Sequence, residues 1–345
     1  MAETPALHGT PAKGEFGRLL ALLDPAQPVR VQTHDYPDLD ALASAWGLAS
    51  LLETRGLRAR ACYRGPIRSR SLSRLIAELD IGFDENPASG EDSQILVVDG
   101  SPANGNVSLV RGRLVGVIDH HRHDSEPPAP FIDIRPDLAS CSTLILGYWT
   151  SEGRRLSRNL ATALLAGLQS DTDFLSRRAS LEDFAAYSEL FAMGDFERAS
   201  RIVRCVLDLR ELDLVTAALA KAVVRDGTFF AWMPGSCGQE VLGVLADFVL
   251  RTEELRLVVI AELDGPEENP EGRWNSVAGV HLSARSKDPA LSAFAVMKGA
   301  LESLGSGGGH SHAAGGFVPF AAFPGPEALR ERFLALPREV RANHA

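Results

Sequence analysis

Three apolar runs, each ending in a histidine or an aspartate, constrain the fold more than any other feature of the sequence. PVRVQTH ends at His34, SQILVVD ends at Asp99 and RLVGVID ends at Asp119. Continuous apolar strands of this kind are typical of a parallel sheet that is covered on both faces. Because the carboxyl ends of parallel strands meet at one edge, where α/β proteins bind ligands, we expect these three side chains to lie close together.

The remaining segments extend this α/β pattern into a second part. Helical spacing of apolar residues predicts helices over 41–56 and 157–169, with a strand over 57–65 and a mostly helical stretch over 181–225. Residues 1–20 are polar or small, and we expect them to be loosely ordered. The second part is predicted to contain strands over 228–234, 255–263 and 274–285, helices over 239–251 and 290–304, and a glycine-rich loop over 306–316.

The composition fits two soluble domains and argues against one class of function. The chain has 345 residues, of which 45% are hydrophobic and 23% charged, with a formal net charge of −10. Such a charge disfavours binding along long nucleic acid, where Lys and Arg must replace counterions. A short anionic substrate remains compatible, because metal ions can supply local positive charge.

Cysteine usage and the absence of membrane signals predict a cytoplasmic protein. The four cysteines are far apart and form no CxxC pair, so we expect reduced thiols. The N-terminus has no signal-peptide pattern, and no apolar run approaches the roughly 20 residues that span a bilayer. No membrane association is expected.

The segment HDYPDLDA places an imidazole and two carboxylates within seven residues. His34, Asp38 and Asp40 follow a predicted strand, and Pro37 stiffens the turn between them. The alternative is a simple loop before a helix, in which one aspartate caps the helix N-terminus.

Three further polar segments complete a candidate metal site. Asp99 ends one strand, DHHRHD contains Asp119, His120 and His121, and SDTDF contains Asp171 after a buried helix. An isolated strand-end aspartate is commonly just a turn residue, but mixed imidazole and carboxylate groups suit divalent manganese, iron or zinc. The number of ligands suits two ions, which can clamp an in-line phosphoryl displacement when one carboxylate bridges them.

The glycine run SGGGHSHAAGG, residues 306–316, is a candidate anion site. Successive glycine amides can form a concave anion nest, and His310 can add a donor. A flexible interdomain or hairpin loop and a histidine-rich metal tract are the alternatives.

The order of these segments resembles the DHH phosphoesterase superfamily with its DHH-associated C-terminal domain. The pattern is H-x-x-P-D-x-D-A, a strand-end aspartate, D-H-H, S-D-T and GGGH-x-x-A-A-G, and it covers residues 28–322. The nearest likeness is to nano-RNases, 3′-phosphoadenosine 5′-phosphate phosphatases and cyclic-dinucleotide phosphodiesterases. The chain departs from many relatives at Tyr36, often asparagine, at Leu39, often glycine, and at Asp173.

The resemblance implies a catalytic domain over 21–200, a linker helix over 201–225 and a smaller α/β substrate-binding domain over 226–335, with a cleft between the domains. It also implies two manganese ions. The implied residue roles are His34 and Asp38 on one ion, Asp40, His120 and Asp171 on the other, Asp99 as the bridge, His121 near the scissile phosphate, Asp119 as an orienting carboxylate, and Arg285, Gly308, Gly309 and His310 as phosphate ligands.

The expected function is hydrolysis of short nucleotides by a hydroxide that two metal ions activate. Candidate substrates are oligoribonucleotides, 3′-phosphoadenosine 5′-phosphate and linear or cyclic dinucleotides. The negative charge and the lack of a basic, aromatic-rich run favour short substrates over long duplexes. A pyrophosphatase or exopolyphosphatase and a catalytically weak nucleotide sensor are the alternatives, and the oligomeric state, including a homodimer, stays open.

Overall fold

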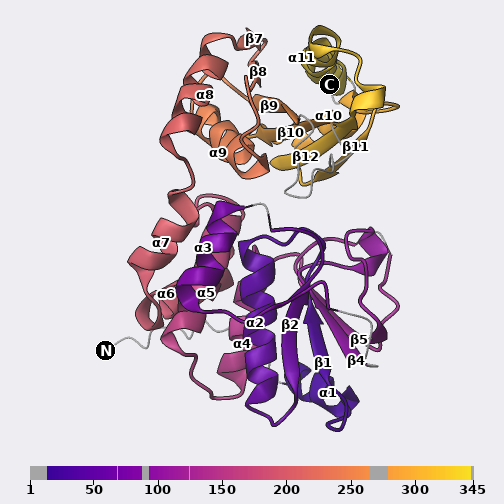
Figure 1. Ribbon diagram of the computed structural model, residues 1–345, viewed down its shortest axis with the longest axis vertical. Coiled ribbons are helices and arrows are strands. Elements are labelled where there is room, and N and C mark those ends of the chain that lie inside the picture. The colour runs from indigo at the N-terminus through magenta and orange to yellow at the C-terminus, as the bar shows by residue number, and fades with distance from the viewer. Residues whose placement is uncertain (1–13, 68, 88–92, 124, 265–278, 343–345) are drawn as a thin grey trace, which may run out of the picture. The chain divides into compact units, whose positions relative to one another are not determined.

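The chain divides into two compact units, residues 1–205 and 206–345, and each is described by itself. The computed structural model describes residues 14–67, 69–87, 93–123, 125–264 and 279–342 (Figure 1). None of the helices within these ranges is long and apolar enough to cross a membrane.

The first unit is built on a six-stranded sheet in the order β3-β2-β1-β4-β5-β6, and every neighbouring pair in it is parallel. This confirms the expectation of a parallel sheet. Pairing of Val31 with both Ala61 and Leu96 puts β1 in the interior of the sheet. The strands are β1 (Val29–Gln32), β2 (Ala59–Tyr63), β3 (Asp84–Glu85), β4 (Ser93–Val98), β5 (Gly112–Asp119) and β6 (Phe131–Ile134).

Helices pack on one face of this sheet, and a loop segment covers part of the other face. The helix α2 lies along β1 and β2 (Figure 1) and also contacts α4 and α5. On the opposite face, Val107 and Val110 pack with buried side chains of β2, β4 and β5. The helices of this unit are α1 (Glu15–Leu22), α2 (Leu39–Glu53), α3 (Arg70–Leu79), the short η1 (Pro102–Asn104), α4 (Cys141–Ser151), α5 (Arg158–Thr172), α6 (Leu181–Met193) and α7 (Phe196–Arg204).

The expectation that residues 1–20 are loosely ordered is wrong for the end of this segment. Residues 15–20 belong to α1, whose Phe16 and Leu19 are fully buried, and Phe16 contacts Tyr148 of α4. The helix forms because Phe16 and Leu19 are three positions apart, a spacing that places both side chains on the helix face that packs into the core. Residues 1–13 lie outside the described residues.

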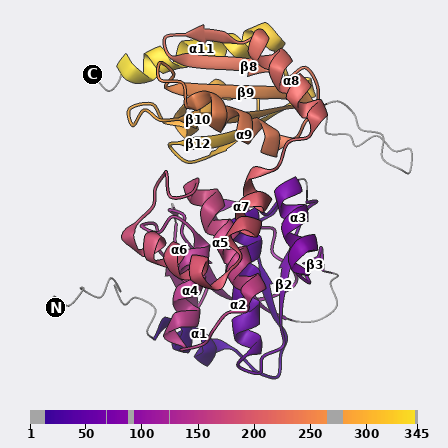
Figure 2. The same ribbon diagram turned by 90° about the vertical axis from the view of Figure 1, so that its left-hand side faces the viewer.

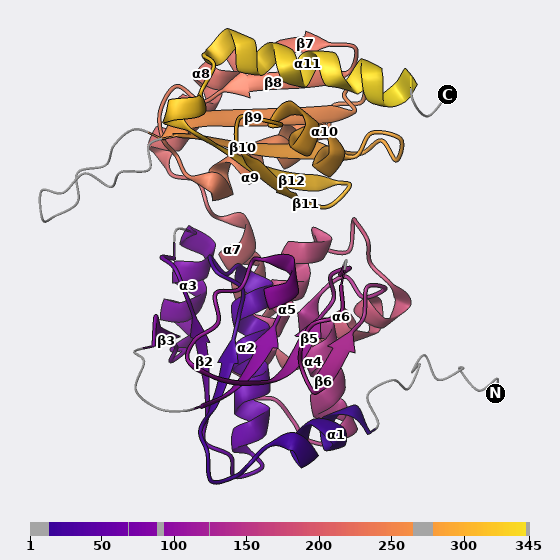
Figure 3. The ribbon, with the colours of Figure 1, turned by 90° about the vertical axis from the view of Figure 1, so that its right-hand side faces the viewer.

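The second unit is a six-stranded mixed sheet with helices on both faces. Its order is β11-β12-β10-β9-β8-β7, in which only β8 and β9 pair in parallel. The helices α8 and α9 pack on one face (Figure 2), and α10 and α11 pack on the other (Figure 3). The elements are α8 (Leu209–Ala220), β7 (Val223–Arg225), β8 (Thr228–Trp232), α9 (Gln239–Leu250), β9 (Leu257–Asp264), β10 (Gly279–Ser286), α10 (Ala293–Ala300), β11 (Ser306–Gly309), β12 (Ala313–Pro319), η2 (Phe320–Ala322) and α11 (Pro326–Ala342).

The predicted linker helix over 201–225 is not one continuous helix. The helix α7 ends at Arg204, α8 begins only at Leu209, and β7 follows from Val223. Asp208 starts the new helix through a capping box with Glu211, in which each side chain accepts a hydrogen bond from the backbone N–H of the other residue. The boundary between the two compact units follows Cys205.

The glycine run also differs from its expected loop conformation. Residues 306–309 form β11 and pair antiparallel with β12, so the segment is a hairpin whose turn is 310–312. A Cβ atom on Gly307 would lie 2.7 Å from Cγ of Met297, and one on Gly316 would lie 2.5 Å from its Sδ. The missing side chains therefore let α10 pack directly against the hairpin.

Candidate metal centre

The carboxyl edge of the first sheet gathers the predicted polar side chains. His34 and Asp99 lie just beyond β1 and β4, and Asp119 is the last residue of β5. Nε2 of His34 lies 3.7 Å from Oδ2 of Asp99, whose side chain is 2% exposed. Asp99 has a φ of 59°, a left-handed conformation that is uncommon outside glycine. The strand-end argument from the sequence is therefore correct for the placement of these groups.

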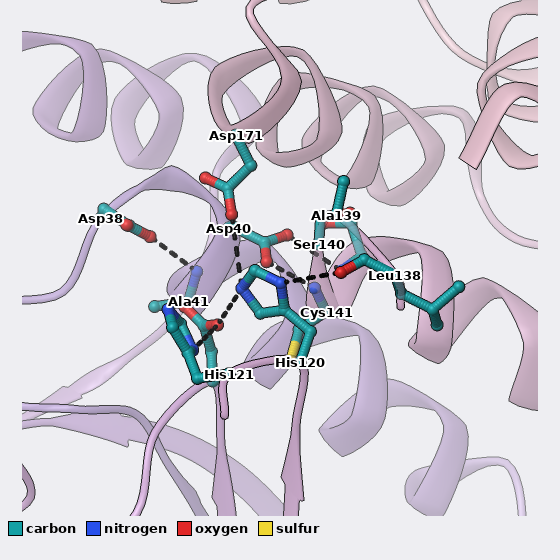
Figure 4. Close-up of polar contacts among 12 residues, drawn as sticks. Asp38, Asp40, Ala41, His120, His121, Leu138, Ala139, Ser140, Cys141 and Asp171 are labelled. Carbon is teal, nitrogen blue, oxygen red and sulfur yellow. Dashed lines mark hydrogen bonds and ion pairs between the residues drawn. The ribbon is translucent and has the colours of Figure 1, made fainter. Parts of the chain in front are cut away.

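The start of α2 supplies two carboxylates with different surroundings. Asp38 caps the helix, because its Oδ1 accepts a hydrogen bond of 3.0 Å from the backbone N–H of Ala41. Asp40 is fully buried and accepts a hydrogen bond of 2.6 Å from the N–H group of Cys141 (Figure 4). It also accepts one of 2.9 Å from the N–H group of Ser142. These two amides begin α4, so a helix N-terminus holds the Asp40 carboxylate from behind.

His120 is fixed by a backbone carbonyl on one side and faces carboxylates on the other. Its Nδ1 donates to the carbonyl oxygen of Leu138 at 3.3 Å. Its Nε2 lies 3.3 Å from Oδ1 of Asp99. The same atom lies 3.5 Å from Oδ2 of Asp171 (Figure 4). A carbonyl on one ring nitrogen selects the tautomer that offers the other nitrogen to a metal.

Among the described residues the ligand atoms form four overlapping groups, three of which contain Asp99. Within each group the candidate ligand atoms lie within 4.8 Å of one another. The groups are His34 with Asp38 and Asp99, Asp40 with His120 and Asp171, Asp99 with Asp119, His120 and His121, and Asp40 with Asp99 and Cys141. The structure thus brings together every candidate of the first unit, and it adds the buried thiol of Cys141, which the sequence did not single out.

The electrostatics of this cluster favour a bound cation. Burial and the nearby Asp99 raise the pKa of Asp40 to about 7. Burial opposes protonation of His120, yet the adjacent Asp99 raises its pKa to about 10. Burial and Asp40 also raise the pKa of Asp171 well above its usual value. Protons are retained because several carboxylates share a buried space, and divalent cations can replace them there.

Two buried atoms of the cluster have no hydrogen-bond partner among the described residues. They are Oδ1 of Asp99 and Nε2 of His120, which face each other without hydrogen-bond alignment. Buried polar atoms are normally paired, and exceptions call for an ion or water. Both atoms are good ligands for a divalent metal, so the donor set fits such an ion.

Asp119 is a buried hub behind the two histidines. Its Oδ1 accepts from Nδ1 of His121 at 2.8 Å and from the backbone N–H groups of His120 and His121. Its Oδ2 accepts from Nε2 of His123 at 2.7 Å, and the side chain of His123 is only 5% exposed. Burial opposes ionisation of Asp119, but the hydrogen bond from His121 lowers its pKa below the usual value. This contact of His123 with Asp119 was not predicted from the sequence, although the segment DHHRHD contains His123.

Two other residues that support the cluster were also missed. Gly167 of α5 packs against Asp40 and Ser142. The buried carboxylate of Asp183 accepts from the N–H of Ala139 at 3.0 Å and from Oγ1 of Thr143 at 2.6 Å. It therefore holds the segment that carries both the Leu138 carbonyl and the N-terminus of α4. No local motif marks such distant supports.

The predicted phosphate ligands of the second unit lie near one another. Arg285 pairs with Ala313 across the strands β10 and β12, beside the hairpin turn. Its Nε donates to Oδ1 of Asp247 at 2.9 Å, so the guanidinium is held by a carboxylate. The backbone N–H of His310 donates to the carbonyl oxygen of Ala313. That amide is therefore used within the turn.

Comparison with known proteins agrees with this arrangement. Residues 28–168, which carry most of the clustered side chains, match the model of the DHH family, N-terminal domain. This match places residues 28–168 in the DHH phosphoesterase superfamily.

Relatives of this DHH protein have several named activities. An uncharacterized protein of Methanocaldococcus jannaschii is 29% identical over 88% of this chain and 61% of its own length. The cyclic-di-AMP phosphodiesterase GdpP of Geobacillus thermodenitrificans is 28% identical, over 51% of this chain and 29% of that protein. A probable manganese-dependent inorganic pyrophosphatase of Bacillus cereus is 29% identical, over 50% of this chain and 57% of that protein. The chain thus spans less than two thirds of each of these relatives.

Solved structures confirm the fold. An exopolyphosphatase-related protein from Bacteroides fragilis superposes with a TM-score of 0.67 at 18% identity, covering 94% of this chain and 96% of that one. RecJ from Thermus thermophilus, in complex with Mn²⁺, gives a TM-score of 0.56 at 20% identity, covering 97% of this chain and 56% of that one.

Proposed function

We propose that this chain is a metal-dependent phosphoesterase that hydrolyses short nucleotides with two divalent ions, manganese being the expected metal. The observation that carries the proposal is a pair of adjacent ligand groups. One group is His34, Asp38 and Asp99, and the other is Asp40, His120 and Asp171. Oδ1 of Asp99 lies 3.3 Å from Nε2 of His120, so Asp99 stands between the two groups. Ions that share one carboxylate can clamp both the attacking and the leaving oxygen of a phosphoryl transfer. The relatives named as phosphodiesterases, pyrophosphatases and a Mn²⁺-bound RecJ support a metal-dependent hydrolase of phosphate compounds.

Each of these two groups would hold one ion. His34 and Asp38 would bind the first, Asp40, His120 and Asp171 would bind the second, and Asp99 would contribute to both. Bound ions would supply Lewis-acid polarisation of the phosphate and activation of a water molecule. The surrounding hydrogen bonds fix the ligands in advance, since the α4 amides hold Asp40 and the Leu138 carbonyl holds His120.

His121 would act on the substrate, with Asp119 as its orienting partner. The hydrogen bond from Nδ1 to the buried Asp119 carboxylate directs the other ring nitrogen, Nε2, away from Asp119. The His121 side chain is 27% exposed, against 1% for His120, so it is the histidine that solvent and substrate can reach. With Nδ1 held by Asp119, Nε2 is the ring nitrogen that would contact a phosphate oxygen or the leaving group of a bound substrate.

The second unit would bind the substrate without performing the chemistry. Arg285 would contact a phosphate, since its guanidinium is planar and oriented by Asp247. Gly308, Gly309 and His310 would border the same phosphate, and Gly308 has open space where a Cβ would lie. The catalytic and substrate-binding domains would coincide with the two compact units, residues 1–205 and 206–345.

A substrate panel tests this proposal against phosphoanhydride hydrolysis, which the pyrophosphatase relatives and the exopolyphosphatase-related fold neighbour favour. Manganese-loaded protein is incubated with di- to pentaribonucleotides, 3′-phosphoadenosine 5′-phosphate, cyclic dinucleotides, pyrophosphate and polyphosphate, and products are separated by chromatography. Nucleotide hydrolysis at the highest kcat/KM is expected. Turnover of pyrophosphate or polyphosphate alone would replace the proposal with the alternative, and no turnover would favour a sensor.

A further inference from the structure

An exposed aromatic side chain lies within the turn that carries two of the candidate metal ligands. Tyr36 is two residues from His34 and two from Asp38, and it is 61% exposed. His34 and Asp38 share a ligand group with the buried Asp99. An exposed tyrosine next to a buried charged cluster offers an apolar surface where a bound phosphate compound would carry its organic part.

The backbone of Tyr36 has an unusual conformation that its neighbours impose. Its φ of 57° is in the left-handed region, which is uncommon for a bulky side chain. The N–H of Tyr36 donates to the carbonyl oxygen of Arg64, and the N–H of Asp35 donates to that of Asn106. Such conformations persist where the surrounding structure fixes them, and they cluster at ligand sites.

A glycine beside the ring fixes where the ring lies. Gly65 has a φ of +83°, and a Cβ atom on it would be 3.2 Å from both Cδ1 and Cε1 of Tyr36. The ring therefore packs on the bare backbone of Gly65 just beyond β2, and most of its surface stays open to solvent. It is positioned at the same sheet edge as the metal ligands.

We propose that Tyr36 is a stacking platform for the nucleobase of the substrate and makes the site prefer nucleotides over inorganic phosphates. This rests on the proposed function, because the metal ligands would hold the phosphate that adjoins the base. Stacking on an aromatic ring tolerates every base and contributes about 1–3 kcal/mol per base, or about 5- to 150-fold in affinity. Pyrophosphate has no base and gains nothing from the ring.

The test compares binding of AMP and of inorganic phosphate to manganese-loaded protein by calorimetry. Tyr36→Asn removes the ring with a residue that tolerates the left-handed conformation, and Tyr36→Phe keeps the ring without the hydroxyl. We expect Tyr36→Asn to weaken AMP binding by about 5- to 150-fold and phosphate binding by less than twofold. Tyr36→Phe should bind both within twofold of wild type. Phe184→Ala, which removes a ring of 59% exposure on α6, is the matched control and should change neither.

The outcomes separate this inference from the function on which it rests. Equal weakening of AMP and phosphate by Tyr36→Asn, or unchanged AMP binding, would overturn the stacking role while hydrolysis of the panel by wild type still supports the phosphoesterase. Absence of all hydrolysis by wild type with two bound ions would instead reject the proposed function. A Tyr36→Asn enzyme with a lower kcat/KM for a dinucleotide and an unchanged kcat/KM for pyrophosphate would support both the stacking role and the proposed function.

Discussion

Gly167 of α5 packs so closely on Asp40 of α2 that a Cβ atom at position 167 would lie 2.8 Å from Oδ1 of Asp40. The same atom would lie 2.5 Å from Oγ of Ser142, at the start of α4. Three helices therefore meet around one carboxylate, and a hydrogen in place of a side chain lets them do so. The position of a candidate metal ligand depends on a residue more than a hundred positions away in the chain.

Gly167→Ala should therefore destabilise the protein and disturb the metal site together. The added methyl forces apart buried groups that are already in contact, which typically costs about 1–3 kcal/mol. Displacement of Asp40 should also weaken manganese binding. Gly17→Ala is the matched control, because Gly17 lies in α1 with open space at its Cβ position, and it should stabilise by about 1 kcal/mol through helix propensity. Thermal unfolding measures the stability, and manganese titration measures the metal affinity. A Gly167→Ala protein with wild-type manganese affinity would contradict the prediction.

Asp99→Ala should prevent binding of both ions. Asp99 shares a ligand group with His34 and Asp38, and its Oδ1 lies 3.3 Å from Nε2 of His120 in the second group. Its removal therefore takes a negative charge from beside both groups. Asp99→Asn should behave almost the same, since a neutral amide cannot offer two anionic oxygens. Elemental analysis of manganese-reconstituted protein should give two ions per chain for wild type and for Asp137→Asn, which changes an exposed carboxylate. One ion or none in the wild type would disprove the two-ion assignment.

His120 and His121 should separate metal loading from turnover. His120 is 1% exposed and directs Nε2 toward Asp99 and Asp171, so His120→Ala should lose one ion. His121 is directed by Asp119, so His121→Ala should keep most of its metal while kcat falls by about 10²- to 10⁴-fold. Metal content and kcat are measured on the same preparations. Equal metal loss in the two variants would contradict the different roles.

The sheet edge could be predicted because it follows from local sequence alone. Apolar runs without alternation indicate a parallel sheet, and a parallel sheet brings the strand-end residues His34, Asp99 and Asp119 to one edge. The supports of these groups could not be predicted in the same way. Gly167 and Asp183 reach the site through helix packing, and neither spacing nor residue type marks them as different from an ordinary helix glycine or helix cap.

The glycine run at 306–316 differs from its prediction for another reason. Glycines between apolar segments indicate a loop, because glycine is a common turn residue. Here the glycines at 307 and 316 are strand residues whose missing side chains admit Met297. The contact partner lies on α10, and only the folded structure reveals why the strand lacks side chains.

Asp183→Asn should weaken binding of the ion that Asp40 would hold, because Asp183 fixes the backbone segment that positions its ligands. The Asp183 carboxylate accepts from Ala139 and Thr143, and asparagine can satisfy only part of this set. Loss of a direct partner of a metal ligand typically lowers metal affinity about 10- to 100-fold. Asp183 acts one step further out, through the backbone, so a loss of about 10-fold or less is expected. Thr143→Val removes one donor and should give a smaller change. Manganese titration should show two binding steps, and an equal loss of affinity in both would mean that Asp183 supports the whole unit.

Adjacent glycines in the hairpin should respond differently to alanine. Gly309 has a φ of +131°, and a Cβ atom on it would lie 2.4 Å from the carbonyl oxygen of Ala313, whereas Gly308 has nothing within 4 Å of that position. Gly309→Ala should therefore distort the turn that carries His310 and lower the thermal stability of the second unit, while Gly308→Ala should leave it nearly unchanged.

The kinetics of the same pair test whether this hairpin binds substrate. If the hairpin borders a phosphate, Gly308→Ala should raise KM on the best nucleotide substrate without a matching loss of kcat, because a methyl group would fill the open space. Arg285→Ala should raise KM similarly and leave metal content unchanged. A Gly308→Ala enzyme with wild-type KM, beside an unstable Gly309→Ala protein, would show that the glycines serve only the packing of α10 against β11 and β12.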